Sequence, residues 1–429
     1  MTSLTPNLRR LALFATIAVA AHAWAQTLAR PGWAGSGMNS DPWWKHALLY
    51  QIDPKSFSSE GLQGISKRLD YVKTLSADAI LLDGITSGNI DSAIGTTDDL
   101  DDLIHQASSR SIRVLIDLDP KAPDLNSVAR LWLTHGVAGF YVPGATPAQL
   151  AELKKLTASF VGQRILVGEV DQSDQSDNQQ NHASDAPQLL ADPRPGTAQQ
   201  FTAAAVRPAL ESSQALTQPS RPVSLLLSDG PTYARSFSRY ADGSHDIAIA
   251  KTLAAILFAT RSGSLLYYGQ ELGLASSSPE GTVQIIHWDP PPKPKPGTAP
   301  VPQTDGPNVP LEDSDPKSLL NWYRQLIALH RSNRIINSGE QIILNHDDQN
   351  VLAWIRKPQT VSYQSPPIVV VCNLSSQPVT LSLKNDIQKL HLRGSFLKPV
   401  LRSDNGMGAM HLDGMTLAPY MVYIGQLLY

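Results

Sequence analysis

The amino-acid sequence predicts an α/β fold: a (β/α)8 TIM barrel followed by a small antiparallel β-sandwich domain. Short apolar, β-branched runs alternate with segments of helical periodicity from about residue 47 to residue 335, which is typical of parallel strands covered by helices. After residue 335 most segments are short strand-like runs separated by turns. A chain of 429 residues is long enough for one large and one smaller domain.

Eight strand-like runs precede residue 270, and eight parallel strands over this length suit a closed barrel. The runs are Ala47–Ile52, Ala79–Leu82, Ile112–Leu118, Val137–Val142, Ile165–Val167, the weaker Gln188–Ala191, Ser224–Leu227 and Ser264–Tyr267. Helices are expected at Leu62–Leu75, Leu100–Ala107, Leu125–Leu133, Pro147–Leu156, Asp246–Thr260 and Leu319–Arg331.

The barrel is expected over residues 42–335 and the sandwich over residues 336–429. Two stretches, Asp171–Ala186 and Pro290–Pro310, have no periodic pattern and are interpreted as loops, which either shape a site or are solvated. The sandwich strands are expected at Gln341–Leu344, Asn350–Arg356, Ile368–Asn373, Val379–Leu383 and Met421–Leu427.

The first residues have the pattern of a secretory signal peptide. Arg9 and Arg10 precede the apolar run Leu11–Ala21, and Ala23–Ala25 forms an A-x-A cleavage site before Gln26. We therefore expect a signal peptide over residues 1–25, a linker over 26–41, and a secreted or periplasmic chain. An uncleaved membrane anchor is the alternative, but the apolar run is short for a span.

Composition narrows the classes of function. The chain is 42% hydrophobic and 17% charged, as in globular proteins, and its net charge of −3 favours neither nucleic acid nor an anionic membrane as partner. Cys372 is the only cysteine, so no internal disulfide is possible; it lies in an apolar run and is expected to be a core thiol. No metal site and no cofactor motif is recognised.

The run Gly136–Ala145 (GVAGFYVPGA) resembles the fourth-strand motif of the α-amylase family, glycoside hydrolase family 13. Further resemblances follow in the family's order: Trp43-Trp44-Lys45, Tyr50–Phe57, Leu266–Gly273 and Leu417–Tyr420. The resemblance implies the barrel and sandwich already expected, and α-glycosidase chemistry. A retaining glycosidase needs two carboxyl groups about 5–5.5 Å apart, one as nucleophile and one as acid/base.

The fourth-strand motif departs from the family at the residues that carry this chemistry. Where the family has its arginine and its nucleophilic aspartate, this chain has Tyr141 and Pro143. Proline offers no group that could attack a sugar carbon. The resemblance therefore implies a glycosidase scaffold whose nucleophile position is lost.

Other motif positions are kept in part. Glu169 in Leu166–Val170 stands at the acid/base position that the resemblance implies, and Asp117 stands at a largely structural position that could contact substrate. Around the seventh strand, Arg235 matches a family arginine and is a candidate substrate-binding residue. Asp229 is either a third carboxylate or an Asp-Gly turn, depending on whether the alignment is anchored on the strand or on Arg235.

Some family features are absent. A tyrosine that stacks on the sugar is missing after the second strand, both family histidines are replaced, and the domain inserted after the third strand is missing. Three functions compete: a catalytically silent protein that binds a glucan or oligosaccharide or acts as a scaffold, an active retaining or inverting α-glycosidase with a rearranged site, and a protein-partner scaffold similar to transporter heavy subunits. Aromatic residues at the barrel mouth would favour sugar binding, and a broad apolar face would favour a protein partner.

Overall fold

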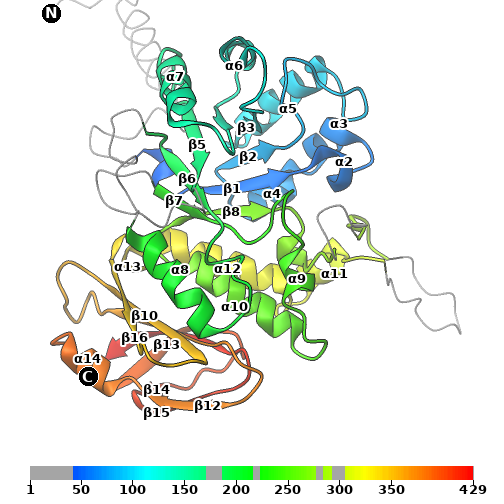
Figure 1. Ribbon diagram of the computed structural model, residues 1–429. Helices are drawn as coiled ribbons and strands as arrows, with labels where there is room; N and C mark the ends of the chain where they lie inside the picture. Colours follow the sequence, from blue (N-terminus) through cyan, green and yellow to red (C-terminus); the bar gives the residue numbers. More distant parts are fainter. Residues whose placement is uncertain (1–41, 171–185, 216–222, 277–283, 292–304, 429) are drawn as a thin grey trace, which may run out of the picture. The chain divides into compact units, whose positions relative to one another are not determined.

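The computed structural model describes residues 42–170, 186–215, 223–276, 284–291 and 305–428. Eight parallel strands form a closed barrel in chain order (Figure 1), which confirms the predicted fold class. They are β1 Leu48–Ile52, β2 Ala79–Leu82, β3 Arg113–Asp117, β4 Gly139–Tyr141, β5 Ile165–Glu169, β6 Leu189–Asp192, β7 Val223–Leu226 and β8 Gly263–Tyr267. Strands β1 and β8 pair with each other and close the barrel.

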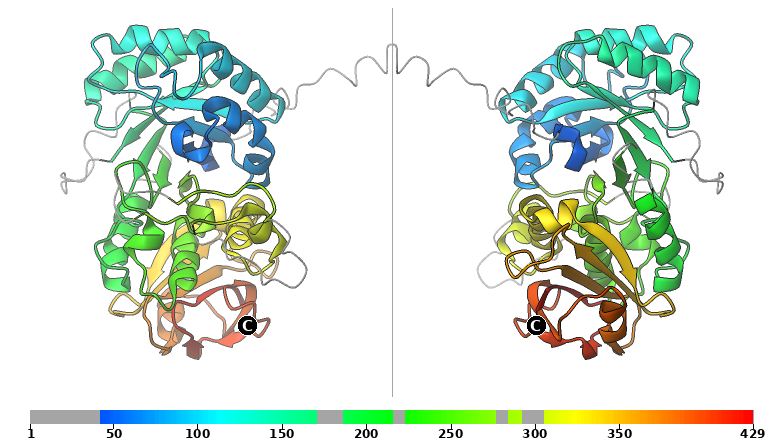
Figure 2. Two further views of the ribbon diagram at one scale, coloured as in Figure 1. Left: turned by 90° about the vertical axis from the view of Figure 1, so that its right-hand side faces the viewer. Right: turned by 90° about the vertical axis from the view of Figure 1, so that its left-hand side faces the viewer.

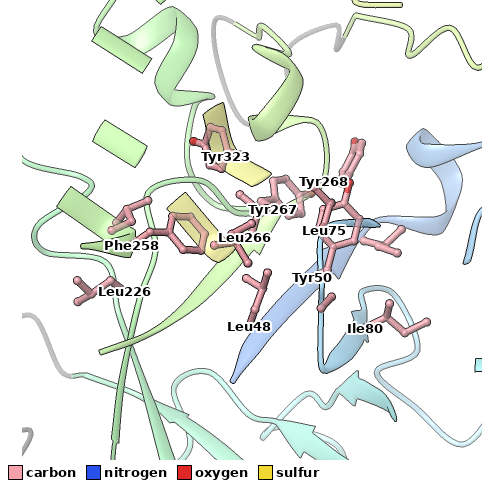
Figure 3. Packing of buried hydrophobic residues seen from close by; sticks show 14 of the residues in the cluster. Leu48, Tyr50, Leu75, Ile80, Leu226, Phe258, Leu266, Tyr267, Tyr268 and Tyr323 are labelled. Carbon is pink, nitrogen blue, oxygen red and sulfur yellow. The ribbon is translucent and has the colours of Figure 1, made fainter. Parts of the chain in front are cut away.

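Side chains alternate along these strands between the barrel interior and the surrounding helices, as the strand period of two requires. Interior residues form one apolar cluster, which includes Leu81, Leu115 and Val167. Their neighbours, such as Ile80 and Leu166, belong to a larger cluster between strands and helices. Figure 3 shows part of this outer core, where Leu226, Leu266 and Phe258 lie together. The alternation decides which strand-end residues face the barrel interior.

The helices expected from apolar periodicity are present, with one correction. They are α5 Thr97–Ser109, α6 Leu125–Thr134, α7 Pro147–Ala158, α10 Asp246–Phe258 and α12 Leu319–Ser332. The single helix expected at Leu62–Leu75 is two helices, α3 Gly61–Lys67 and α4 Leu69–Thr74. Arg68 lies between them outside the helical region, at φ −111° and ψ 11°, and its guanidinium donates to the Gly64 carbonyl.

The sequence prediction omitted several elements. These are α2 Pro54–Phe57, α8 Ala203–Ala215, α9 Ser236–Arg239, α11 Val309–Ser314, α13 Arg334–Ser338 and α14 Lys384–Lys389, with the 3-10 helices η1 Trp43–His46 and η3 Gln270–Leu272. In α8, Pro208 interrupts the helical pattern because proline lacks the amide hydrogen of a helix interior. The boundary predicted between residues 335 and 336 falls inside α13, and Trp43–Tyr429 forms one compact unit.

The C-terminal residues form two antiparallel sheets, which confirms the predicted sandwich. A six-stranded sheet has the order β14-β13-β16-β11-β10-β9, and a two-stranded sheet pairs β12 with β15. The bounds are β9 Glu340–Leu344, β10 Val351–Lys357, β11 Ile368–Asn373, β12 Val379–Ser382, β13 Phe396–Arg402, β14 Met410–His411, β15 Asp413–Leu417 and β16 Val422–Leu428. The prediction missed β13, whose register shifts after Pro399, and β14 and β15.

The larger sheet is covered on both faces. Trp354 and Val370 join the core of the barrel helices, whereas Ile355 and Val371 join the core between the two sheets. Figure 2 shows the orange and red C-terminal strands on the outer side of the green and yellow helices of the barrel. Burial on both faces explains why Ile368–Cys372 is an uninterrupted apolar run rather than an alternating one.

Several predictions fall partly or wholly outside the described residues. These are the signal peptide over 1–25, the linker over 26–41, nearly all of the loop Asp171–Ala186, and most of the loop Pro290–Pro310. Among the described helices, none combines the length and the apolar character that a membrane span requires.

Candidate functional site

The candidate site lies at the barrel mouth, defined here as the end of the barrel where the parallel strands finish. Three of the predicted residues, Asp117, Tyr141 and Glu169, are the last residues of β3, β4 and β5. The alternation of side chains along each strand turns them toward the barrel interior. By the same alternation Asp83, two residues after Leu81, joins them from the end of β2. Functional groups of TIM barrels lie at this end.

Tyr141 occupies the centre of this group. Its side chain is 8% exposed and belongs to the cluster inside the barrel. The pKa of its phenol is raised well above the ordinary value, first by burial and then by the charges of Glu169, Asp83 and Asp117. The residue at the family's arginine position is therefore a neutral, buried hydroxyl among carboxyl groups rather than a cation.

Asp83 and Asp117 are neighbouring carboxyl groups on adjacent strands. Gln51 donates from Nε2 to Asp83 Oδ1 over 2.7 Å, and the pKa of Asp83 is raised by burial and by the charge of Asp117. Burial also raises the pKa of Asp117 to about 6, although the backbone amides of Ile85 and Gly84 donate to its carboxylate and oppose the rise. Asp117 thus anchors the loop after β2, in keeping with the structural role that the resemblance implies.

Glu169 ends β5 on the interior side of the barrel. It is partly buried, and burial raises the pKa of its carboxyl group above the ordinary value. A raised pKa is the property that a general acid in a glycosidase requires. Glu169 therefore has the position and the environment of an acid, but a nucleophile opposite it is a separate requirement.

Pro143 lies in the turn after β4. Gly144 has a φ of 69°, and the Ala145 amide donates to the Val142 carbonyl over 3.4 Å. Proline followed by a glycine with positive φ is the preferred central pair of a type II turn. The residue at the nucleophile position is consequently a turn former that leads the chain toward α7.

Asp229 is held by its own loop. Its Oδ1 accepts hydrogen bonds from the Ser236 amide over 3.0 Å and from Ser228 Oγ over 3.1 Å, at the start of α9. Asp229 is fully buried, and Gly230 pairs with Tyr233 across a tight turn. These contacts favour the turn interpretation of this residue over a third catalytic carboxylate.

Arg235 is buried between strands and loop. Its guanidinium donates to the Tyr268 carbonyl and lies 4.2 Å and 4.4 Å from the ring centroids of Tyr267 and Tyr268. Only 3% of the residue is exposed. Its contacts stabilise the end of β8, and direct substrate binding by Arg235 stays a prediction.

Three further residues at the mouth, Asp83, Tyr233 and Tyr267, were not predicted from the sequence. Asp83 follows the interior residue Leu81 by two positions, as Asp117 follows Leu115, and this shared spacing could have indicated it. Tyr233 packs against the interior cluster, and its charge interaction with Tyr141 places it at the mouth. Tyr267 ends β8, and the pKa of its phenol is raised by burial and by the charge of Asp83. These tyrosines lie far from one another in the chain, so no local motif indicates them.

In the parts of the chain that the structure describes, no group of three or more His, Cys, Asp or Glu side chains is arranged to hold a metal ion.

Comparison with known proteins gives short sequence matches and a long structural one. Trehalose-6-phosphate hydrolase of Escherichia coli K12 is 40% identical over 95 residues, which is 18% of this chain and 17% of the relative. Oligo-1,6-glucosidase of Heyndrickxia coagulans is 36% identical over 95 residues, covering 18% and 17%. The amino acid transporter heavy chain of Oryctolagus cuniculus is 28% identical over 168 residues, covering 31% and 32%. The matches therefore span from about a sixth to about a third of these relatives.

Solved structures match over most of the chain. The trehalose-6-phosphate hydrolase of Bacillus licheniformis superposes with a TM-score of 0.76 at 17% identity, covering 91% of this chain and 100% of the other. Isomaltulose synthase from Klebsiella sp. LX3 gives a TM-score of 0.74 at 17% identity, covering 91% and 100%. No protein-family model matches. The chain thus shares the fold of these enzymes over most of its length and short sequence segments with glycosidases, in agreement with its resemblance to the α-amylase family, glycoside hydrolase family 13.

Proposed function

We propose that this chain is a catalytically silent member of its glycosidase family that binds a neutral α-glucan or oligosaccharide at the barrel mouth. The observation that carries the proposal is Pro143, which stands in a turn where the family has its nucleophile. A retaining mechanism forms a covalent glycosyl ester on that residue, and proline has no atom that could form it.

The environment of Tyr141 also supports the absence of catalytic activity. The family's arginine at this position would bring a positive charge to the mouth, whereas Tyr141 brings a phenol whose raised pKa keeps it neutral. Loss of one member of a catalytic unit typically costs several powers of ten in rate. Glu169 alone would then act as an acid without a partner.

The composition of the mouth supports sugar binding. Tyr233 contributes a half-buried aromatic ring, and Asp117 and Glu169, also half-buried, contribute oxygen atoms that accept hydrogen bonds from hydroxyl groups. Tyr141, Tyr267 and Asp83 lie buried beside them. Aromatic surface combined with a few placed polar groups is the usual lining of a small-ligand site.

The test is hydrolysis by the purified chain of 4-nitrophenyl α-glucoside, maltose and starch. We expect no release of glucose above that of a Glu169→Gln variant, together with binding of maltose or maltotriose in a calorimetric titration. Turnover of about 1 per second, within the usual range of enzymes and abolished by Glu169→Gln, would overturn the proposal. It would favour the active α-glycosidase with a rearranged site, in which another carboxylate replaces the nucleophile.

A second function is favoured by one comparison. The 28% identity to a transporter heavy chain extends over 168 residues, which is a longer match than that to either glycosidase described above. A scaffold that binds a protein partner needs no sugar site. Calorimetry separates the two proposals, because the scaffold alone would show no heat of binding with any α-glucan.

We also propose that the chain is secreted or periplasmic. The support is the sequence pattern over residues 1–25, with Arg9 and Arg10 before the apolar run and Ala25 before the expected cleavage. Mass spectrometry of the protein recovered from culture medium or periplasm should give a chain that begins at Gln26. Recovery of the full-length chain in the cytoplasm alone would contradict it.

A further inference from the structure

A pocket lies outside the barrel mouth. It has a volume of about 560 Å³ and is formed where residues 243–248 and Lys251, at the start of α10, meet two turns of the C-terminal domain. Those turns contribute Ser403 and Asp404, and residues 418–421. The volume is in the range of small-ligand sites, about 300–1,000 Å³. None of the mouth residues lines it.

Tyr420 is the aromatic residue of this pocket with an unusual backbone. Its φ is 48°, a conformation that is rare for a bulky side chain and that persists only where the surroundings hold it. Both sides of the pocket hold it here: its amide donates to the Ser375 carbonyl over 3.2 Å, and its carbonyl accepts from Thr252 Oγ1 over 2.7 Å.

The ring of Tyr420 is also held in place. It stacks on Phe201 with an interplanar angle of 25° and a centroid distance of 6.4 Å, and the His245 ring lies 5.5 Å away. Backbone and ring contacts together fix an aromatic surface at the pocket wall before any ligand arrives. A surface that is already ordered loses little conformational entropy on binding.

The charged groups of the pocket already have partners. Asp404 forms a bidentate pair with Arg402, at 2.8 Å and 2.6 Å, and His245 pairs with Asp242 over 2.7 Å. Lys251 donates to the Lys317 carbonyl over 2.7 Å, and Asp246 Oδ1 accepts from two backbone amides. Asp404 is paired with Arg402, and Lys251 and Asp246 carry opposite charges, so the formal charges of these groups offset one another and a neutral polyhydroxyl ligand fits.

Hydroxyl groups complete the lining. Ser244 is exposed at the pocket, and Ser403 Oγ accepts from the Val422 amide over 2.9 Å, which leaves its own hydrogen available for donation. An aromatic surface surrounded by hydroxyl and carboxylate groups of balanced charge matches the two faces of a pyranose, one apolar and one rich in hydroxyls.

We propose that this pocket is a second carbohydrate-binding site, which holds a neutral oligosaccharide against Tyr420. The site is independent of the proposed function of the barrel mouth, because it needs neither Glu169 nor Tyr141. It would attach the chain to a sugar polymer while the mouth stays accessible.

The experiment is calorimetric titration with maltotriose of the full-length protein and of its Tyr420 variants. Tyr420→Ala should weaken the second site about tenfold, the loss expected for one aromatic contact, and Tyr420→Phe should stay within about twofold because the ring remains. Tyr363→Ala is the matched control, because Tyr363 is 85% exposed and lies outside the pocket.

A second variant tests the same site in case Tyr420→Ala does not fold. Ser244→Trp leaves Tyr420 in place but fills the pocket, and it should weaken binding to the same extent. The proposal is overturned if both variants bind maltotriose as the wild type does, if a crystal soaked in maltotriose shows no sugar against Tyr420, or if inorganic phosphate binds this pocket more tightly than the sugar. A Glu169→Gln variant that still binds maltotriose at Tyr420 would show that the second site binds sugar independently of the barrel mouth.

Discussion

At the scale of single residues, the end of β4 differs most from what a glycosidase needs. Tyr141 fills the interior end of the strand, and Pro143 begins a turn in which Gly144 has a φ of 69°. Across the mouth, Asp83, Asp117 and Glu169 are carboxyl groups whose pKa values are all raised by burial. Carboxyl groups of raised pKa are thus present, while Tyr141 and Pro143 stand at the positions where the resemblance implies a cation and a nucleophile.

Restoring the nucleophile alone should not restore activity. In a Pro143→Asp variant, hydrolysis of 4-nitrophenyl α-glucoside should stay at least about a thousandfold below that of an active family member, because groups that act as a unit do not recover singly. The measurement is the initial rate, with Pro143→Asn as a matched control that makes the same change in the turn without a carboxylate. A rate within tenfold of an active enzyme would show that Tyr141 does not block the chemistry.

Asp117 should make stability depend on pH. Burial raises the pKa of its carboxyl group from 3.8 to about 6. Because the folded-state pKa lies above the unfolded-state value, the stabilisation is fully present below pH 3.8 and is lost as the pH rises through about 6, by about 3 kcal/mol. Asp117→Asn should lack this loss and gain stability relative to wild type between pH 4 and pH 7.

Urea unfolding of both proteins at several pH values measures this difference directly. Groups that do not interact with Asp117 titrate equally in both proteins and cancel in the comparison, whereas the pKa of Asp83 falls when the charge of Asp117 is removed. Stability curves that run parallel from pH 4 to pH 7 would contradict the raised pKa.

At the scale of elements, local signals define most helices and strands. Helix α5 begins with a capping box, in which the Asp99 amide donates to Thr96 Oγ1 and the Thr96 amide donates to the Asp99 carboxylate. Helix α7 begins with the same arrangement at Thr146 and Gln149. Where the local pattern was weak, as in α8 with its internal Pro208, neighbouring elements rather than propensity stabilise the helix.

Removing one of these caps should have a small, measurable cost. Thr96→Ala leaves an amide at the start of α5 without its acceptor and should lower the free energy of unfolding by about 1 kcal/mol. Thr96→Ser keeps the hydroxyl and should be close to neutral. Urea denaturation of the two variants side by side tests the cap, and an equal loss in both would assign the effect to the lost methyl group instead.

At the scale of the whole molecule, the six-stranded sheet of the sandwich packs directly on the barrel helices. Trp354 in β10 is fully buried in the core of the barrel helices, and its Nε1 donates to the Ala259 carbonyl over 2.9 Å. Arg207 of α8 donates to the carbonyls of Asp348 and Val351 at the start of the same strand. The barrel and the sheet therefore share one continuous core, which fits the single compact unit Trp43–Tyr429.

Truncation of this shared contact should destabilise both parts together. Trp354→Ala should lower the free energy of unfolding by about 3–5 kcal/mol through the cavity it leaves, and Trp354→Phe should cost less because it leaves a smaller cavity. Circular dichroism and tryptophan fluorescence should shift together in one denaturation transition. If the sheet unfolded separately while the barrel transition stayed unchanged, the shared core would not couple them.

The barrel strands, most helices of ten or more residues, and the positions of Asp117 and Glu169 in the strand motifs could be predicted from the amino-acid sequence. The reason is local: a strand alternates its side chains with a period of two, so a residue two positions after a buried interior residue continues toward the mouth. Tyr141 and Pro143 could also be recognised from the sequence as departures from the family pattern, because this requires the match of only one short motif.

Only the tertiary structure brought together groups that no local pattern connects. It placed Asp83 beside Asp117, engaged the Asp229 carboxylate with the Ser236 amide, and formed the pocket around Tyr420 from α10 and the C-terminal turns. It also buried both faces of Ile368–Asn373. These features arise from contacts between residues far apart in the chain, whose burial and hydrogen-bond partners are set by packing and not by sequence spacing.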